Sequence, residues 1–110
     1  MKKWLIAGAF CICPMPSQAG YFDTGNDYWA RCFGKQNIIC AATAASYLDM
    51  MEALGYKCSI DGVDRAQTKD VLLKYMADHP EDRNIPASFL AISAFQAAFN
   101  CKIPPKPMSQ

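Results

Sequence analysis

The stretch from Cys58 to Cys101 decides the fold, and it reads CSIDGVDRAQTKDVLLKYMADHPEDRNIPASFLAISAFQAAFNC. It predicts two helices joined by an acidic turn, with a cysteine at each end. Asp64 is suited to cap the first helix, and Gln67 stands at the capping-box position behind it. Apolar residues at helical spacing give this helix a buried side: Leu72, Leu73, Tyr75 and Met76.

The acidic turn begins where His79 and Pro80 end the first helix, because proline disfavours a helical residue before it. Pro86 is expected to be the first residue of the next helix, where its missing N–H costs no hydrogen bond. Aromatic and aliphatic residues then recur at helical spacing and are expected in the core: Phe89, Ile92, Phe95 and Phe99.

Two further helices are predicted before Cys58. The first is short, with Thr24 as its cap, Asp27 in its first turn and Gly34 as its stop. The second runs from about residue 38 to 54, is rich in alanine and ends at Gly55, a plausible C-cap. No strand-like alternation of any length is present. The predicted fold class is therefore all-α, a small four-helix domain.

The N-terminus has the pattern of an export signal. Met1-Lys2-Lys3 is a positive segment, residues 4–13 are apolar, and Ser17-Gln18-Ala19 predicts cleavage after Ala19. The apolar run is too short for a stable membrane anchor, and no second run predicts a span. Cys11 and Cys13 raise the possibility of lipidation, but a bulky residue precedes each of them.

Cleavage also changes the charge balance. Removing 19 of the 110 residues leaves 91, with 9 basic and 10 acidic residues in place of 11 and 10. This balance lacks a basic stripe and disfavours nucleic acid as a partner. The predicted domains are the signal peptide (1–19), a helical domain (20–101) and a proline-rich, flexible tail (102–110).

Four cysteines remain after cleavage, and an even number in a small exported chain predicts two disulfides. Cys40 and Cys58 lie at opposite ends of the second helix, on the order of 20 Å apart, whereas a disulfide needs α-carbons within about 7 Å. Two pairings survive, and Cys32–Cys40 with Cys58–Cys101 is favoured because Cys32 precedes the start of that helix. No Cys-x-x-Cys pair is present, so zinc is not expected.

The sequence offers little catalytic chemistry. A Cys–His nucleophile pair would need the single histidine, His79, and a free thiol, but the cysteines are more economically paired with each other. Glu81 and Asp82 resemble an acid/base pair, although adjacent carboxylates in a polar turn are usually solvated. We therefore expect neither an enzyme nor a cofactor or metal, and Met50 and Met51 are expected in the core.

The order of several motifs resembles the Tai/Rap family, exported immunity proteins that protect bacteria from type VI secretion amidase effectors. The resemblance covers nearly all of the mature chain. It rests on Thr24-Gly25-Asn26, Cys32, Cys40, Cys58, Gly62-Val63, Tyr75, His79-Pro80-Glu81, Arg83, Pro86-Ala87, Phe99 and Cys101. One departure concerns a glycine- and tyrosine-rich stretch after the second cysteine of the family, where Ala42, Thr43 and Ser46 stand here.

The resemblance implies a periplasmic, disulfide-bonded helical protein, commonly a homodimer, that binds a peptidoglycan amidase effector and blocks its active site. Loops on a rigid scaffold usually carry such contacts. The candidate partner-binding residues therefore lie in three connectors: Lys35, Gln36 and Asn37; Tyr56 and Lys57, in the connector that continues to Asp61; and His79, Glu81, Asp82 and Arg83. The last turn also has a purely structural interpretation, because it ends one helix and starts another.

Three other functions remain open at this stage. A periplasmic acid-stress-type chaperone is also small, helical, exported and disulfide-bonded. Ten acidic residues and one histidine argue only weakly for a pH switch, since carboxylates would respond only at quite low pH. An accessory protein of an envelope complex fits the same sequence. An enzyme is the least favoured.

Overall fold

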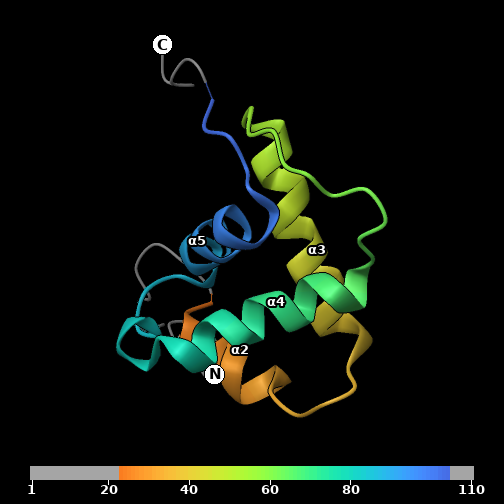
Figure 1. Cartoon of the computed structure of the whole chain (residues 1–110). Coiled ribbons are helices and arrows are strands. Elements are labelled where there is room, and N and C mark those ends of the chain that lie inside the picture. Colours follow the sequence, from red (N-terminus) through yellow and green to blue (C-terminus); the bar gives the residue numbers. More distant parts are fainter. Residues whose placement is uncertain (1–22, 105–110) are drawn as a thin grey trace, which may run out of the picture.

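The computed structural model describes residues 23–104, which form four α-helices and one short 3-10 helix (Figure 1). They are α2 (Gly25–Cys32), α3 (Ile38–Ala53), α4 (Arg65–Asp78), η2 (Pro80–Asp82) and α5 (Ala87–Phe99). Within this range, β pairing is limited to two isolated bridges, so the predicted all-α class is confirmed. The predicted signal peptide (1–19) and residues 105–110 of the predicted tail lie outside the described range.

Side chains that cap the helix ends explain where the helices begin. Thr24 and Asp27 form a reciprocal capping box, in which each side chain accepts a hydrogen bond from the other residue's backbone N–H. The carboxylate of Asp64 accepts from the backbone N–H of Gln67 at 2.8 Å, which confirms the predicted cap of α4.

Two predicted helix boundaries are wrong by one residue. Pro86 is the N-cap of α5 rather than its first residue, because its ψ of 139° is extended and it forms a bridge with Thr24. The helix therefore begins at Ala87. At the end of α3 the C-cap is Leu54, and Gly55 takes the next position with a φ of 103°. This positive φ is the conformation for which glycine is suited.

The core forms where α4 packs against α3 and α5 (Figure 1). Alanines on α3 and α5 keep the facing helices close, since Ala44, Ala91 and Ala94 are all buried. Larger side chains fill the remaining space: Leu48, Met51, Leu72, Leu73, Met76, Leu90, Phe95 and Phe99. Met50, predicted in the core beside Met51, is partly buried against it.

Phe89 is the exception among the predicted core residues, because its side chain is 59% exposed. The buried face of α5 repeats at three- and four-residue intervals from Ala87 through Leu90, Ala91, Ala94 and Phe95. Phe89 is two residues from Ala87, which places it on another side of the helix. Its assignment to the core was therefore wrong.

Both predicted disulfides are confirmed, Cys32–Cys40 and Cys58–Cys101. The first closes the short connector between α2 and α3. The second ties the α3–α4 connector to the end of α5, and paired backbone hydrogen bonds between Lys57 and Lys102 continue this attachment. Each disulfide thus fixes a connector to a helix end.

No helix between residues 23 and 104 is long and apolar enough to cross a bilayer.

Candidate partner-binding site

The connector between α2 and α3 is held in one conformation by local contacts. The backbone N–H of Phe33 caps α2 by donating to the carbonyl of Trp29 at 2.9 Å. Gly34 then turns the chain with a φ of 74°. Asn37 caps α3, its Oδ1 accepting from the N–H of Ile39 at 2.8 Å. The Cys32–Cys40 disulfide closes the loop at its base.

This connector carries a group of exposed apolar side chains. Phe33 is 53% exposed, Ile38 75% and Ile39 60%. We call these three residues the connector patch. Isolated exposed apolar residues are ordinary, but a group on one ordered loop is typical of a contact surface. The sequence alone did not single out this patch, because two adjacent apolar residues on a helix can also both be buried, as Leu72 and Leu73 are.

A cleft of about 400 Å³ lies between this connector and α4. We call it the connector cleft. Lys35 and Gln36, both predicted as contact residues, line it, and the Nζ of Lys69 donates to the carbonyl oxygen of Lys35 at 3.2 Å across it. The complete lining is Phe33, Gly34, Lys35, Gln36, Lys69, Asp70, Leu73, Lys74 and Ala77. Two of the predicted residues therefore border a real depression.

Charge in the cleft is predominantly positive. Three lysines line it with a single carboxylate, that of Asp70, although the whole chain carries 11 basic and 10 acidic residues. Lys74 also forms an exposed ion pair with Asp78 at 3.0 Å, on the same face of α4. An exposed pair of this kind adds little stability, so the Lys74 side chain is readily redirected.

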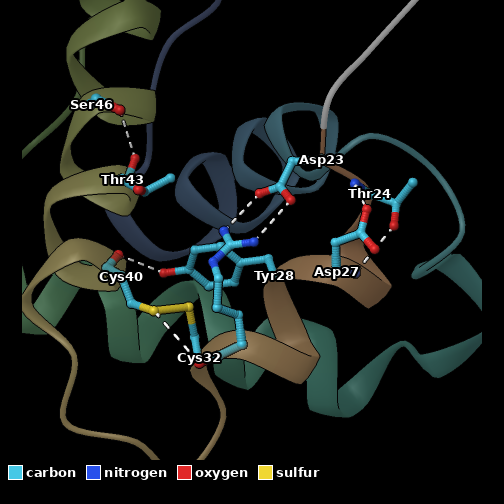
Figure 2. Close-up of polar contacts among 9 residues, drawn as sticks. Asp23, Thr24, Asp27, Tyr28, Cys32, Cys40, Thr43 and Ser46 are labelled. Atoms are coloured by element: carbon cyan, nitrogen blue, oxygen red, sulfur yellow. Dashed lines mark hydrogen bonds and ion pairs between the residues drawn. A yellow bond between two sulfur atoms is a disulfide. The ribbon is translucent and has the colours of Figure 1, made fainter. Parts of the chain in front are cut away.

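Tyr28 links α2 to the start of α3 beside the Cys32–Cys40 disulfide (Figure 2). Its side chain is fully buried, and its hydroxyl donates to the carbonyl of Cys40 at 2.7 Å. Burial is the main reason that the pKa of Tyr28 is raised well above its ordinary value. On the same helix Arg31 makes a two-pronged ion pair with Asp23, with N–O distances of 3.1 and 2.8 Å. These contacts anchor α2 to α3 and to the chain before it.

The predicted turn at residues 79–83 is mainly engaged within the domain. Arg83 donates through Nε to the carbonyl of Met76 at 2.9 Å, and its guanidinium lies 3.9 Å from the ring centroid of Trp29. His79 stacks on the ring of Tyr75, and its Nδ1 lies 2.9 Å from the Tyr75 carbonyl oxygen. These contacts give the turn a structural role, while Glu81 remains exposed and Asp82 partly so.

The third predicted connector, residues 56–61, is tied to the end of α5. Tyr56 is partly buried and Lys57 is exposed, while the N–H of Ser59 donates to the carbonyl of Phe99 at 2.9 Å. In Figure 1 the three predicted connectors lie at different corners of the domain. The structure therefore does not gather them into one surface.

Residues 23–104 contain neither a cluster of metal-ligating side chains nor a buried polar side-chain atom without a hydrogen-bond partner. No group of three or more His, Cys, Asp or Glu side chains in this part of the chain is arranged to hold a metal ion. Every buried side-chain nitrogen or oxygen found there has a hydrogen-bond partner, so no polar atom in the interior awaits a ligand.

Comparison with protein families gives one match, to a family described as Rap1a immunity proteins, over residues 20–101. This range covers the predicted helical domain from end to end. No curated protein and no solved structure matches the chain.

Proposed function

The chain belongs to the Rap1a immunity protein family, and from this premise we propose that it binds a type VI secretion peptidoglycan amidase effector in the periplasm and blocks its active site. The observation that carries the proposal is the family match across residues 20–101. Immunity in such a family means binding an effector protein. The amidase class of the effector and the type VI route come from the motif resemblance and are part of the proposal.

Two features support the periplasm as the place of action. The signal-like segment at residues 1–19 directs export, and the two disulfides are of the kind that form in an oxidising compartment. Both agree with a target that cleaves peptidoglycan, because an inhibitor of that enzyme must reach the same compartment.

A rigid scaffold supports inhibition by binding. The disulfides and helix caps order the connectors before any partner arrives, so little conformational entropy remains to be lost on association. All three predicted connectors stay candidate contacts. We include homodimer formation in the proposal, and sedimentation of the purified mature protein tests it: a single species of monomer mass at micromolar concentration rejects the dimer.

A rescue assay tests the function. The hydrolase encoded beside the gene for this chain is exported into the periplasm of a test bacterium, with and without this protein. We expect lysis to be prevented by the full chain and not by a version lacking residues 1–19. A folded, exported protein that leaves lysis unchanged would reject the proposed function.

The same strains distinguish the alternatives. An acid-stress-type chaperone would hold unfolded client proteins at low pH without protecting cells from the hydrolase, and an accessory envelope protein would do neither. Protection at neutral pH, requiring export, is expected of the immunity function alone.

A further inference from the structure

We propose that the connector patch and the connector cleft together form the effector-contacting surface, and that the occupant is an effector segment in which an apolar side chain is flanked by carboxylates. The inference rests on the proposed function and deepens it by assigning the surface and the chemistry of its partner. Three observations support it: the patch is exposed, the loop is held in one conformation, and the cleft is lined mainly by positive charges.

The apolar part of the surface is exposed and already ordered. Phe33 is stacked on Trp29 with ring centroids 4.0 Å apart, and more than half of its side chain still faces water. Ile38 and Ile39 occupy the first two positions of α3, whose backbone is fixed by the Asn37 cap. Burial of these side chains by a partner is favourable, and the ordered loop leaves little entropy to lose.

The charge of the cleft indicates which charges the partner should carry beside its apolar side chain. Lys35 is exposed at its rim and Lys69 donates to the Lys35 carbonyl, against the single lining carboxylate of Asp70. Lys74 borders the cleft on α4, where it is also paired with Asp78. A partner carrying carboxylates beside its apolar side chain would meet complementary charge, which favours both association rate and register. A basic partner segment would be repelled.

A second copy of this chain is the less suitable occupant. A two-fold interface uses the same patch on both subunits, so a dimer centred on the cleft would bring Lys35, Lys69 and Lys74 of one copy toward the same three lysines of the other. Like charges brought together in this way oppose association. Charge complementarity therefore favours a different, acidic partner.

The other depression and the other exposed apolar side chains give less support for a contact surface. A groove of about 220 Å³ between α4 and α5 is lined mainly by alanines, Val71 and Tyr75, and its two charges, Lys74 and Asp78, pair with each other. Nothing in that groove indicates what would cover it. Ile85 and Phe89 are exposed near the start of α5 and line neither of these two depressions, which makes them suitable controls.

The test measures binding of the purified mature protein to the purified hydrolase encoded beside its gene, by titration calorimetry. The double variant Ile38→Ser/Ile39→Ser removes apolar surface, and its control is Ile85→Ser/Phe89→Ser. We expect the first to weaken binding about 10- to 100-fold and the control less than about threefold. Each side chain is at least 36% exposed, so folding is retained, which melting curves verify.

A charge reversal tests the second part. Lys35→Glu leaves the Lys69 contact in place, because that contact uses the backbone carbonyl of Lys35. We expect weaker binding and a smaller loss of affinity with added salt than for the wild-type protein. Lys102→Glu is the matched control, since Lys102 is exposed, is not a candidate contact, and its hydrogen bonds to Lys57 involve the backbone only.

The outcomes separate the two proposals. Wild-type binding that all four variants retain would overturn the assignment of this surface and leave the proposed function standing. Wild-type protein that neither binds nor prevents lysis would reject the function and the surface together. Loss of self-association, rather than of effector binding, in Ile38→Ser/Ile39→Ser would assign the patch to a dimer interface and also overturn the inference.

Discussion

Replacing Gly25 with alanine has two opposing effects on stability, because alanine favours the helix while its added methyl group overcrowds the packing. Gly25 is the first residue of α2 and is buried, and its backbone N–H donates to the carbonyl of Ile85 at 2.9 Å. A Cβ at this position would collide with the Cδ1 of Leu90 and lie 2.9 Å from the backbone oxygen of Arg83. The helix therefore docks on the segment before α5 through a contact that only glycine fits.

The magnitude follows from the two opposing effects. Alanine in place of glycine favours a helix by at most about 1 kcal/mol. An extra methyl group in a packed interior costs about 1–3 kcal/mol, and the upper part applies here because one colliding atom belongs to the backbone and cannot rotate away. We expect Gly25→Ala to lower the free energy of unfolding by about 1–2 kcal/mol, which corresponds to a fall in Tm of about 4–16 °C for a domain of this size.

Thermal unfolding followed by circular dichroism measures the effect. Asn26→Ala is the control, because Asn26 is the next residue on the same helix, is exposed, and should change the unfolding free energy by less than about 0.5 kcal/mol. A Tm for Gly25→Ala equal to or above that of the wild-type protein would show that helix propensity dominates and that the close approach of α2 does not constrain position 25.

Three further predictions concern the connector and its support. Replacing both Cys32 and Cys40 with alanine opens a disulfide loop of sequence separation 8 and should lower the free energy of unfolding, measured in urea, by about 2.5 kcal/mol. An unchanged urea midpoint would contradict this. Asn37→Ala removes the α3 cap and should cost about 1 kcal/mol, measured in the same way, whereas no loss would show that the cap is dispensable. The pKa of Tyr28 is raised in the folded state above its ordinary value of 10.0, whereas in the unfolded chain it is ordinary. Neutral Tyr28 therefore contributes its full stabilisation below pH 10.0, and this stabilisation is lost as the pH rises further, because the unfolded chain releases the proton first. Tm should therefore fall above about pH 10, and Tyr28→Phe should reduce that dependence; an identical slope in the variant would remove Tyr28 as the cause.

Much of the fold could be predicted because its determinants are local. The caps at Thr24 and Asp64 each satisfy backbone N–H groups within three residues, so their residue types alone identify the helix starts. Helix length excluded one disulfide pairing, since a helix between Cys40 and Cys58 keeps these cysteines apart, and the nearness of Cys32 to the start of that helix favoured the pairing that forms.

The candidate site was predicted less completely. Lys35 and Gln36 were identified as loop residues and do line the connector cleft, but Lys69 and Lys74, on the opposite wall, lie more than thirty residues further along the chain. Arg83 was proposed as a partner contact, yet its guanidinium lies on Trp29 and its Nε donates to the carbonyl of Met76. Nothing in the spacing of these residues indicates that they meet.

The sequence by itself determined the helices and their order and favoured the disulfide pairing that forms, because periodicity, capping and chain reach act over a few residues or follow from helix length. Only the tertiary structure decided that Gly25 must be glycine, that Phe89 faces water and that lysines of α4 stand beside the α2–α3 connector. These features depend on how one helix packs on another. Several packings bury nearly the same apolar area, so the hydrophobic pattern alone does not select among them.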